Sequence, residues 1–417
     1  MKLEVLTIGS ELLLGYTVDT NAAELGRALA AAGAEITRRA TVADRPDAIA
    51  AAIREALDRT GFVITTGGLG PTADDMTKTV VAGLLGKKLV QDRGILAALE
   101  ARFRRFGRPM PASNRSQADV PEGATVLPNP RGTAPGLWVE DDRGRVVVML
   151  PGVPSEMRGL LFEEVLPRLA ARARDGGEPR VVLSRTIRTT GVPESALAER
   201  VGPVEEAIAP LTLAYIPTTE GVDLRLTAWG LTRADAEAKL SRAGDELRKT
   251  AGEHCYGEDE TDLAAVVLDL LRRSGRRLAV AESCTGGLVG ARLTAVPGAS
   301  EVFVGGAVAY ADEVKRDLLD VPAEILETHG AVSEPTVRAM AEGAAKRFGA
   351  ACAIAVTGIA GPAGGTPEKP VGTVWLAARA GDAMRTVSRV FPGERDEIRK
   401  RSAQAGLDLL RRLLVQR

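Results

Sequence analysis

The sequence predicts an α/β protein with more than one domain. Apolar strand-like segments alternate with amphipathic helical segments along most of the chain. Several strands end in glycine-rich loops followed by helices, which is typical of parallel sheets covered by helices on both faces. A length of 417 residues corresponds to two or three domains of about 100–200 residues each.

The composition excludes several functional classes. The 54 Lys and Arg residues balance 55 Asp and Glu residues, so nucleic acid and anionic membranes are not expected as main partners. No apolar run approaches the roughly 18–20 residues that a membrane helix needs. Three Cys and two His residues, widely spaced, fit neither a disulfide framework nor a Cys/His zinc site. We therefore expect a cytoplasmic protein in which any metal is a hard cation on carboxylates.

Residues 1–174 are predicted to form a doubly wound domain, because strand and helix patterns alternate there. A cluster of turn-forming residues, Arg174–Pro179, marks its end. The expected strands are 2–8, 34–41, 62–66 and 146–150, and the expected helices are 21–32, 45–59 and a segment ending near 173.

Residues 175–254 are predicted to form a small α+β module, with residues 252–260 as a linker. No GxxG loop occurs in 181–252, where nine basic residues face ten acidic ones, so nucleic-acid binding is not expected. A spacer or dimerisation role fits better. The expected strands are 181–190, 211–216 and 222–229, the last two forming a hairpin, and the expected helices are 193–209 and 233–251.

Residues 255–417 are predicted to form a second α/β domain. It opens with a helix and a strand, and closes with a long helix that carries Ile398 and Leu414. The expected helix is 263–274, and the expected strands are 277–281, 302–310, 350–357, 372–378 and 384–391.

A glycine-rich loop, Thr66–Thr77, follows a buried strand in the first domain. Its glycines allow a ligand to approach the backbone, and the next helix offers free N–H groups to a phosphate. Two adjacent acids, Asp74 and Asp75, would repel a phosphate unless a cation such as Mg²⁺ lies between them. The alternative is purely structural: Asp74 caps the helix and Asp75 favours its dipole.

Together with Asn129–Gly136 and Leu150–Met157, this loop resembles the MoaB/MogA-type molybdopterin-binding fold, in the version found in the CinA family. The resemblance implies a metal-dependent ADP-ribose pyrophosphatase. The functional acids of related proteins match Asp44 and Asp75, so it implies a divalent metal (Mg²⁺ or a similar ion) on Asp44, Asp74 and Asp75. Pterin binding without hydrolysis is the alternative.

A second glycine turn, Ala281–Gly287, follows a strand in the last domain. Ser283 and Thr285 stand there at a helix start that suits an anion or oxyanion. Ser and Thr also cap helices without any further function. Cys284 has no activator nearby in sequence, so we interpret it as a buried packing residue.

Ser300, Tyr310 and Lys315 lie around the next strand, and a hydrolase without His can use such a set. A neutral lysine takes the serine proton, and the serine attacks an amide carbonyl. A solvated helix lysine is the structural alternative. Thr357–Gly365 is a further glycine-rich loop, and Arg395, in the first turn of the last helix, suggests an anionic partner.

These segments, with His329–Ser333 and Glu368–Val374, resemble the C-terminal domain of the CinA family, the PncC-type nicotinamide-nucleotide amidase. The resemblance implies hydrolysis of nicotinamide mononucleotide to nicotinate mononucleotide and ammonia, with no cofactor. We expect Ser300 as nucleophile and Lys315 as base, and Ser283 to orient the nucleotide with Arg395, although the two serines could exchange these roles. The remaining implied residues are Tyr310 and Thr357 near the oxyanion, and Arg395, Thr285, Gly286, Gly358 and Gly361 at the nucleotide.

For the middle module the resemblance is to the KH-type insert of long CinA proteins. The family resemblance also implies a homodimer, with ADP-ribose and nicotinamide mononucleotide as small-molecule partners and no membrane partner. A non-enzymatic competence-associated role is the remaining alternative, and two sets of polar site residues argue against it as the whole function.

Overall fold

The computed structural model describes residues 1–173 and 180–415. They divide into two compact units, Met1–Leu183 with Ala228–Glu237, and Ser184–Thr227 with Ala238–Arg417. The predicted boundary cluster, Arg174–Pro179, lies outside the described residues. No helix within the described ranges has the length and apolar character needed to cross a membrane.

The N-terminal unit is built on a six-stranded sheet with the strand order β2-β1-β3-β8-β7-β6. The first four strands are parallel, as predicted for a doubly wound domain, and the last two are antiparallel. The strands are β1 (Lys2–Ile8), β2 (Glu35–Val42), β3 (Phe62–Thr66), β6 (Thr125–Leu127), β7 (Gly136–Glu140) and β8 (Val146–Leu150).

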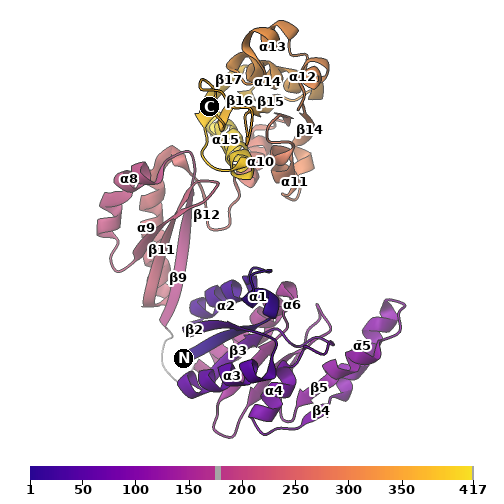
Figure 1. Ribbon diagram of the computed structural model, residues 1–417. Coiled ribbons are helices and arrows are strands. Elements are labelled where there is room, and N and C mark those ends of the chain that lie inside the picture. Colours follow the sequence, from indigo (N-terminus) through magenta and orange to yellow (C-terminus); the bar gives the residue numbers. More distant parts are fainter. Residues whose placement is uncertain (174–179, 416–417) are drawn as a thin grey trace. The chain divides into compact units, whose positions relative to one another are not determined.

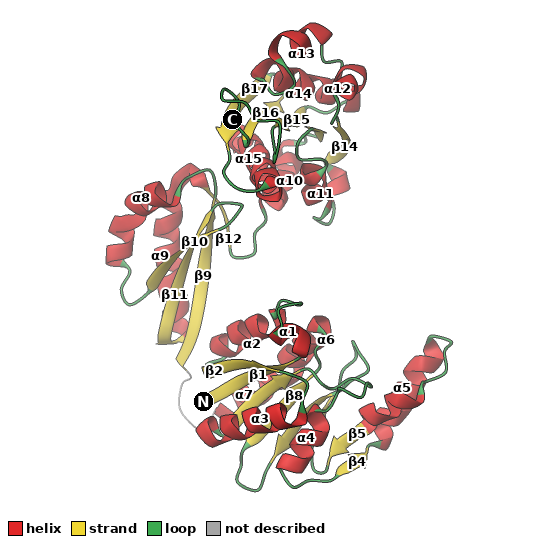
Figure 2. Ribbon diagram, in the orientation of Figure 1, coloured by secondary structure: helices red, strands yellow, loops and turns green. Residues whose placement is uncertain are grey.

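Helices cover both faces of this sheet, because its central strands are apolar on both sides. Figure 2 shows α2 on one side of the strands and α3 and α4 on the other. The helical segments are α1 (Ser10–Leu13), α2 (Thr20–Ala31), α3 (Pro46–Thr60), α4 (Thr77–Leu84), α5 (Arg93–Arg105), the 3₁₀ segment η1 (Ala112–Ala118), and a run of α6 (Pro154–Leu160), the π-helical η2 (Leu161–Val165) and α7 (Leu166–Ala173). Two short strands, β4 (Leu89–Gln91) and β5 (Asp119–Pro121), pair beside α5.

The middle module contains a four-stranded sheet, ordered β10-β11-β9-β12. The last of these strands, β12 (Cys255–Glu258), lies inside the segment predicted to be a linker and pairs antiparallel with β9. That prediction is therefore wrong: four residues with a central glycine carry too little pattern to reveal a strand, and pairing with β9 creates it. The other elements are β9 (Arg180–Thr189), α8 (Glu194–Ala207), β10 (Thr212–Pro217), β11 (Val222–Thr232), α9 (Arg233–Ala251) and the 3₁₀ turn η4 (Gly252–His254).

The C-terminal sheet has the order β14-β13-β15-β16-β17. Its first three strands are parallel, so their carboxyl ends share one edge, and β16 and β17 are antiparallel additions. One face packs on α10, α11 and α15, and the other on α12 and α14. The elements, seen in Figure 1, are α10 (Leu263–Ser274), β13 (Leu278–Glu282), α11 (Leu288–Thr294), η5 (Ala299–Glu301), β14 (Phe303–Val308), α12 (Asp312–Leu319), α13 (Ala323–His329), α14 (Glu334–Phe348), β15 (Cys352–Gly358), β16 (Thr373–Ala380), β17 (Ala383–Val390) and α15 (Arg395–Val415).

Candidate functional site

A cavity of about 270 Å³ lies at the carboxyl ends of the parallel strands β13, β14 and β15. The loops that follow these strands meet there, as expected for ligand sites of open α/β sheets. Seven residues predicted from the sequence line this cavity: Ser283, Tyr310, Lys315, Thr357, Gly358, Gly361 and Arg395.

Lys315 is the buried cation of this cavity, with only 1% of its surface exposed. Its Nζ donates one hydrogen bond to the Tyr310 carbonyl oxygen and one to Asp312 Oδ1, each at 3.0 Å. The helix α12 positions it, because Asp312 and Lys315 are one turn apart on the same face. A fully buried lysine is rare, and this one is not the solvated helix residue that we considered as an alternative.

Ser283 follows directly after β13, is buried, and lines the same cavity as Lys315. Ser300, by contrast, is exposed and lies in η5, before the first residue of β14. Because β13 and β14 are parallel, Ser300 is at the opposite edge of the sheet from Lys315, about one strand length or roughly 20 Å away. Within one chain the structure therefore does not bring Ser300 to the cavity of Lys315, where we expected it, and Ser283 is the predicted serine that lines this cavity.

Cys284 lines the cavity but belongs to the hydrophobic core, where it packs among apolar side chains. Burial raises the pKa of its thiol to about 12, so the thiolate is scarce at neutral pH. The nucleophile in this cavity is therefore not the cysteine, in line with its interpretation as a packing residue.

The helix start after the glycine turn is already occupied by a side chain of the protein. Buried Glu282, the last residue of β13, accepts hydrogen bonds from the backbone N–H groups of Gly287, Val289 and Gly290 at 2.8–3.0 Å. These three N–H groups are therefore not free for a ligand anion. Sequence reasoning missed Glu282, although an acid at the end of an all-apolar buried strand was a signal.

Thr285 and Gly286 are not among the residues that line the cavity. The Thr285 side chain is buried, and its carbonyl oxygen accepts hydrogen bonds from Arg399 Nε and Nη2 at 3.3 and 2.9 Å. The structure thus assigns this threonine to the connection between the glycine turn and α15. Our expectation that Thr285 and Gly286 contact the nucleotide is corrected accordingly.

Arg395 connects two loops at the rim of the cavity. Its Nη2 donates to the Tyr310 hydroxyl at 2.7 Å, and its Nη1 donates to the Gly361 carbonyl oxygen at 2.5 Å. The adjacent acid Asp396 pairs with Lys400 instead. Arg395 is therefore not neutralised by a carboxylate neighbour, which leaves its positive charge available to an anion.

Thr357 is buried at the end of β15, and its hydroxyl donates to the Ala331 carbonyl oxygen at 2.8 Å. This hydrogen bond holds the His329–Ser333 segment over the cavity, and Lys369 Nζ adds further bonds to the carbonyls of His329 and Val332. Because its proton is already used, Thr357 positions a loop in this arrangement rather than donating to an oxyanion.

The predicted acids of the N-terminal unit also follow parallel strands, but they remain apart. Asp44, after β2, accepts from the Ser10 backbone N–H at 2.7 Å, whereas Asp75, after β3, accepts from the Thr72 N–H and hydroxyl. Since β1 lies between β2 and β3, the two strands are roughly 10 Å apart. Asp74 is exposed on the same loop as Asp75.

A metal held by Asp44, Asp74 and Asp75 together does not fit these positions. Among the described residues, no group of three or more His, Cys, Asp or Glu side chains is placed to hold a metal ion. We expected the glycines of the loop to let a ligand approach the backbone. Gly67 and Gly68 have positive φ, and a Cβ at either would collide with Ile8 or Thr77, so both glycines pack against the protein itself.

Lys78 is a buried cation beside this loop that sequence reasoning missed. It lies in the first turn of α4, three residues after Asp75, and its Nζ donates to the Ser116 carbonyl oxygen at 2.6 Å. Burial lowers the pKa of Lys78 to about 8, although Asp119 and Asp75 attract its proton. A lysine one turn after an acid-rich loop was the available sequence signal.

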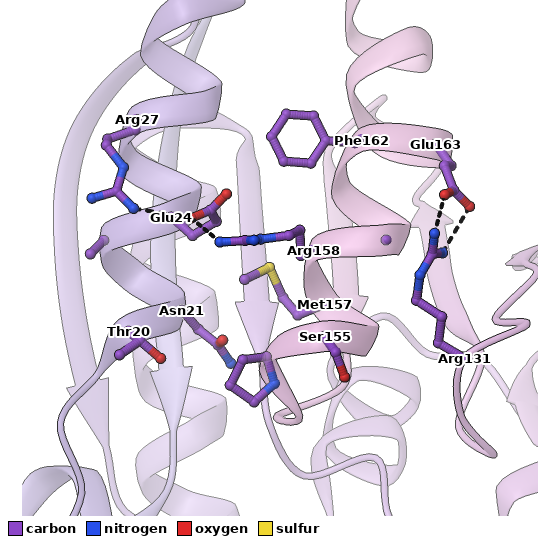
Figure 3. Close-up of a pocket in the computed structure, with 13 residues that line it drawn as sticks. Thr20, Asn21, Glu24, Arg27, Arg131, Ser155, Met157, Arg158, Phe162 and Glu163 are labelled. Atoms are coloured by element: carbon purple, nitrogen blue, oxygen red, sulfur yellow. Dashed lines mark hydrogen bonds and ion pairs between the residues drawn. The ribbon is translucent and has the colours of Figure 1, made fainter. Parts of the chain in front are cut away.

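A larger cavity of about 830 Å³ lies between α2 and the α6–η2 segment, and Figure 3 shows its side chains. Glu24 pairs with both Arg27 and Arg158, so one carboxylate faces two guanidinium groups on this side. Arg131 pairs with Glu163. Its lining does not include the predicted acids of the neighbouring loops.

Asn21 connects this cavity to the sheet. Its Nδ2 donates to Thr66 Oγ1 at 3.1 Å and to the Gly152 carbonyl oxygen at 2.7 Å, which ties α2 to the loops after β3 and β8. The side chain was missed from sequence, although a polar residue beside apolar Leu25 and Leu29 on one helix face was the signal.

Family models match three successive parts of the chain. "Probable molybdopterin binding domain" matches residues 4–171, "Damage-inducible protein CinA KH domain" matches 184–257, and "CinA C-terminal domain" matches 260–414. These matches agree with the three resemblances noted from sequence motifs.

Relatives match over the full length. A CinA-like protein of Gemmatimonas aurantiaca is 56% identical over 417 residues, covering 100% of this chain and 97% of the relative. A CinA-like protein of a Synechococcus species is 46% identical, covering 98% and 97%. The crystal structure of the competence/damage inducible protein CihA from Agrobacterium tumefaciens is 43% identical, covers 37% of this chain and 94% of that one, and has a TM-score of 0.36. The full-length identity to CinA-like proteins shows that this chain belongs to the CinA family.

Proposed function

We propose that the C-terminal domain is an amidase that hydrolyses nicotinamide mononucleotide to nicotinate mononucleotide and ammonia. The observation that supports it most is a buried lysine, Lys315, in the same cavity as a buried serine, Ser283. A lysine can serve as the base for a serine nucleophile when no imidazole is present. Neither His254 nor His329 lines this cavity.

In the proposed reaction, Lys315 in its uncharged form takes the proton of the Ser283 hydroxyl. The serine oxygen forms a bond to the carboxamide carbon, and the bond from that carbon to nitrogen breaks. The Lys315 ammonium returns its proton to the leaving nitrogen, so ammonia departs and an ester remains. Water then gives a proton to Lys315 and attacks the ester carbon, and Lys315 returns the proton to the departing Ser283 oxygen.

Asp312 holds Lys315 at the cavity. Its carboxylate accepts a hydrogen bond from Lys315 Nζ at 3.0 Å, while 54% of its own side chain is exposed. Asp312 acts in this scheme as a positioning residue, since it reaches the reacting atoms only through Lys315.

The polar groups at the rim suit the phosphate of the substrate. Within the part of the chain that the structure describes, Arg395 forms no ion pair with a carboxylate, and the glycines of the 358–364 loop bring backbone close to the cavity. With a volume of about 270 Å³, the enclosed part suits the pyridine ring and its amide, which leaves the phosphate at the rim.

The paired variants Ser283→Ala and Ser300→Ala test the proposal, because they separate the serine in the cavity from the serine at the other edge. We expect Ser283→Ala to abolish ammonia release from nicotinamide mononucleotide and Ser300→Ala to leave it unchanged. The measurement is ammonia production by the purified full chain. Absence of ammonia release in the wild type, or loss in Ser300→Ala alone, would overturn the assignment.

A second activity, hydrolysis of ADP-ribose at the pyrophosphate bond, is proposed for the N-terminal unit. The supporting observation is the loop after β3, where Asp75 and buried Lys78 lie three residues apart at the carboxyl end of a parallel strand. Divalent metal is proposed as a requirement brought with the substrate phosphates rather than a resident of a three-carboxylate site. Measuring ADP-ribose cleavage and molybdopterin binding, each with and without metal, distinguishes hydrolysis from binding alone.

A further inference from the structure

A third cavity, of about 750 Å³, lies in the C-terminal unit and contains none of the residues assigned above to catalysis or phosphate binding. One wall is formed by β17 and the middle of α15, and the loops 190–194 and 217–222 of the middle module form the other. Both walls belong to the same compact unit of the chain.

Three arginines give this cavity uncompensated positive charge. Arg385 and Arg389 come from β17, where alternate residues share one face, and Arg401 comes from α15. Within the described ranges, none of the three forms an ion pair with a carboxylate. Arg389 only donates to the adjacent Ser388 carbonyl oxygen.

The acids of the lining are mostly engaged with other arginines. Asp408 pairs with Arg411 and Arg412, Glu253 pairs with Arg412, and Glu220 pairs with Arg188. Glu194, at the start of α8, is the remaining lining acid. Among the described lining residues, the charged groups without an ion-pair partner are therefore three guanidinium groups and one carboxylate, so the unpaired charge is positive.

Gln404 adds a buried amide donor, and its hydrogen bond with Arg292 determines which end of the amide is the oxygen. Its side chain is 2% exposed, and its Oε1 accepts a hydrogen bond from Arg292 Nη1 at 2.7 Å. Because Arg292 is only a donor, the other end of the amide must be the NH₂ group. That nitrogen and Arg401 Nε are both buried without a hydrogen-bond partner. Buried donors left unpaired are unfavourable, so they favour a ligand that brings acceptor oxygens.

Apolar side chains complete the lining beside these donors. Val387 lies between the two arginines on the same face of β17, and Phe391 and Leu409 also line the cavity. Guanidinium groups bind phosphate oxygens through paired hydrogen bonds, and an apolar wall can bury the face of a ring. We propose that this cavity binds a nucleoside phosphate, with its phosphates on Arg385, Arg389 and Arg401 and its base against the apolar wall.

The test uses the full-length protein and 8-azido-ADP as a photo-crosslinking probe, with the labelled peptides identified by mass spectrometry. We expect labelling within residues 383–412. ADP is expected to compete at least about tenfold more strongly than inorganic pyrophosphate, because pyrophosphate lacks the base that the apolar wall would contact.

Two variants and one control test whether these residues bind the probe. Gln404→Glu keeps the acceptor for Arg292 but replaces the free donor with a negative oxygen. The double variant Arg385→Ala/Arg389→Ala removes two cations. Each is expected to weaken labelling of these peptides at least about tenfold. Arg347→Ala, an exposed arginine on α14, is the matched control and should leave labelling unchanged. Absence of label in 383–412, equal competition by pyrophosphate, or equal labelling of all variants would overturn the proposal, whatever the amidase activity.

Discussion

The C-terminal and N-terminal sheets place glycine-rich loops and charged residues at the same kind of edge, yet they form very different sites. At the C-terminal edge, the loops after β13, β14 and β15 meet around one buried lysine and one buried serine. At the N-terminal edge, Asp44 and Asp75 each bind local backbone and do not form a common cluster. The C-terminal edge thus gathers its polar side chains around one cavity, whereas the predicted acids of the N-terminal edge stay apart.

Of the variants proposed here, Lys315→Met is expected to separate the activities of the two domains most strongly. The variant keeps an unbranched buried side chain but removes the base, so we expect deamidation to fall by about 10³-fold or more. ADP-ribose cleavage should be unchanged, because the N-terminal loops contain no part of this site. Both rates are measured on one purified preparation. Parallel loss of the two activities would contradict two separate sites, and a circular dichroism melt checks folding.

Replacing Glu282 with Ala tests the preformed character of the C-terminal edge. The carboxylate accepts three backbone hydrogen bonds that no solvent can replace in a buried position. We expect the free energy of unfolding of this domain to fall by about 3 kcal/mol, measured by urea denaturation. Glu301→Ala, which breaks an exposed pair with Arg272, is the control and should change it by under about 1 kcal/mol. Similar losses in both variants would argue against this role of Glu282.

Replacing Lys78 with Met tests the N-terminal edge through pH. The pKa of Lys78 is about 8 when folded and 10.5 as the reference value, so burial disfavours its charged form. Below pH 8, burying the charged lysine lowers the free energy of unfolding by up to about 3 kcal/mol. This loss of stability disappears as the pH rises from 8 to 10.5. We therefore expect Lys78→Met to melt at a higher temperature than wild type at pH 7, with the difference vanishing near pH 10.5. A difference that grows with pH would contradict the burial argument.

Cys284 gives the smallest expected effect. With the thiol pKa raised to about 12, little thiolate exists at pH 8, and iodoacetamide should modify Cys284 at least about 10³-fold more slowly than free cysteine. Cys284→Ala should keep deamidation within about twofold of wild type. Peptide mass spectrometry and ammonia release measure the two quantities. Rapid alkylation with loss of activity would make the cysteine a participant.

Much of the fold was predictable because the local patterns were strong. Val146–Leu150 is a continuous buried strand, and the helix Leu263–Ser274 has Asp262 as its N-cap and Gly275 in the left-handed conformation at its end. The segment Cys255–Glu258 was missed, since its strand character comes from pairing with β9 and not from its own pattern. Local periodicity therefore identified long elements, and tertiary pairing decided the short one.

The sequence predicted which loops form the candidate site. It did not predict at which edge of the sheet each residue lies or which hydrogen bonds the side chains form. Ser300 precedes a strand whereas Tyr310 follows it, so strand direction alone would have separated them. The bonds of Glu282 to the α11 backbone could not be read from sequence, because a buried acid next to a glycine turn has several possible partners. Spacing indicates which loops meet, but not which donors are still free when they do.

The bridge from Arg395 to Tyr310 and Gly361 has a consequence for substrate entry. A phosphate that takes the Nη1 and Nη2 donors used in these two bonds displaces both of them, so part of the ionic attraction is offset before any net affinity appears. When the product leaves, the same two bonds can re-form. If the C-terminal domain is the amidase that we propose, its ligand-free form has an internal competitor for the nucleotide, which favours rapid turnover over tight retention.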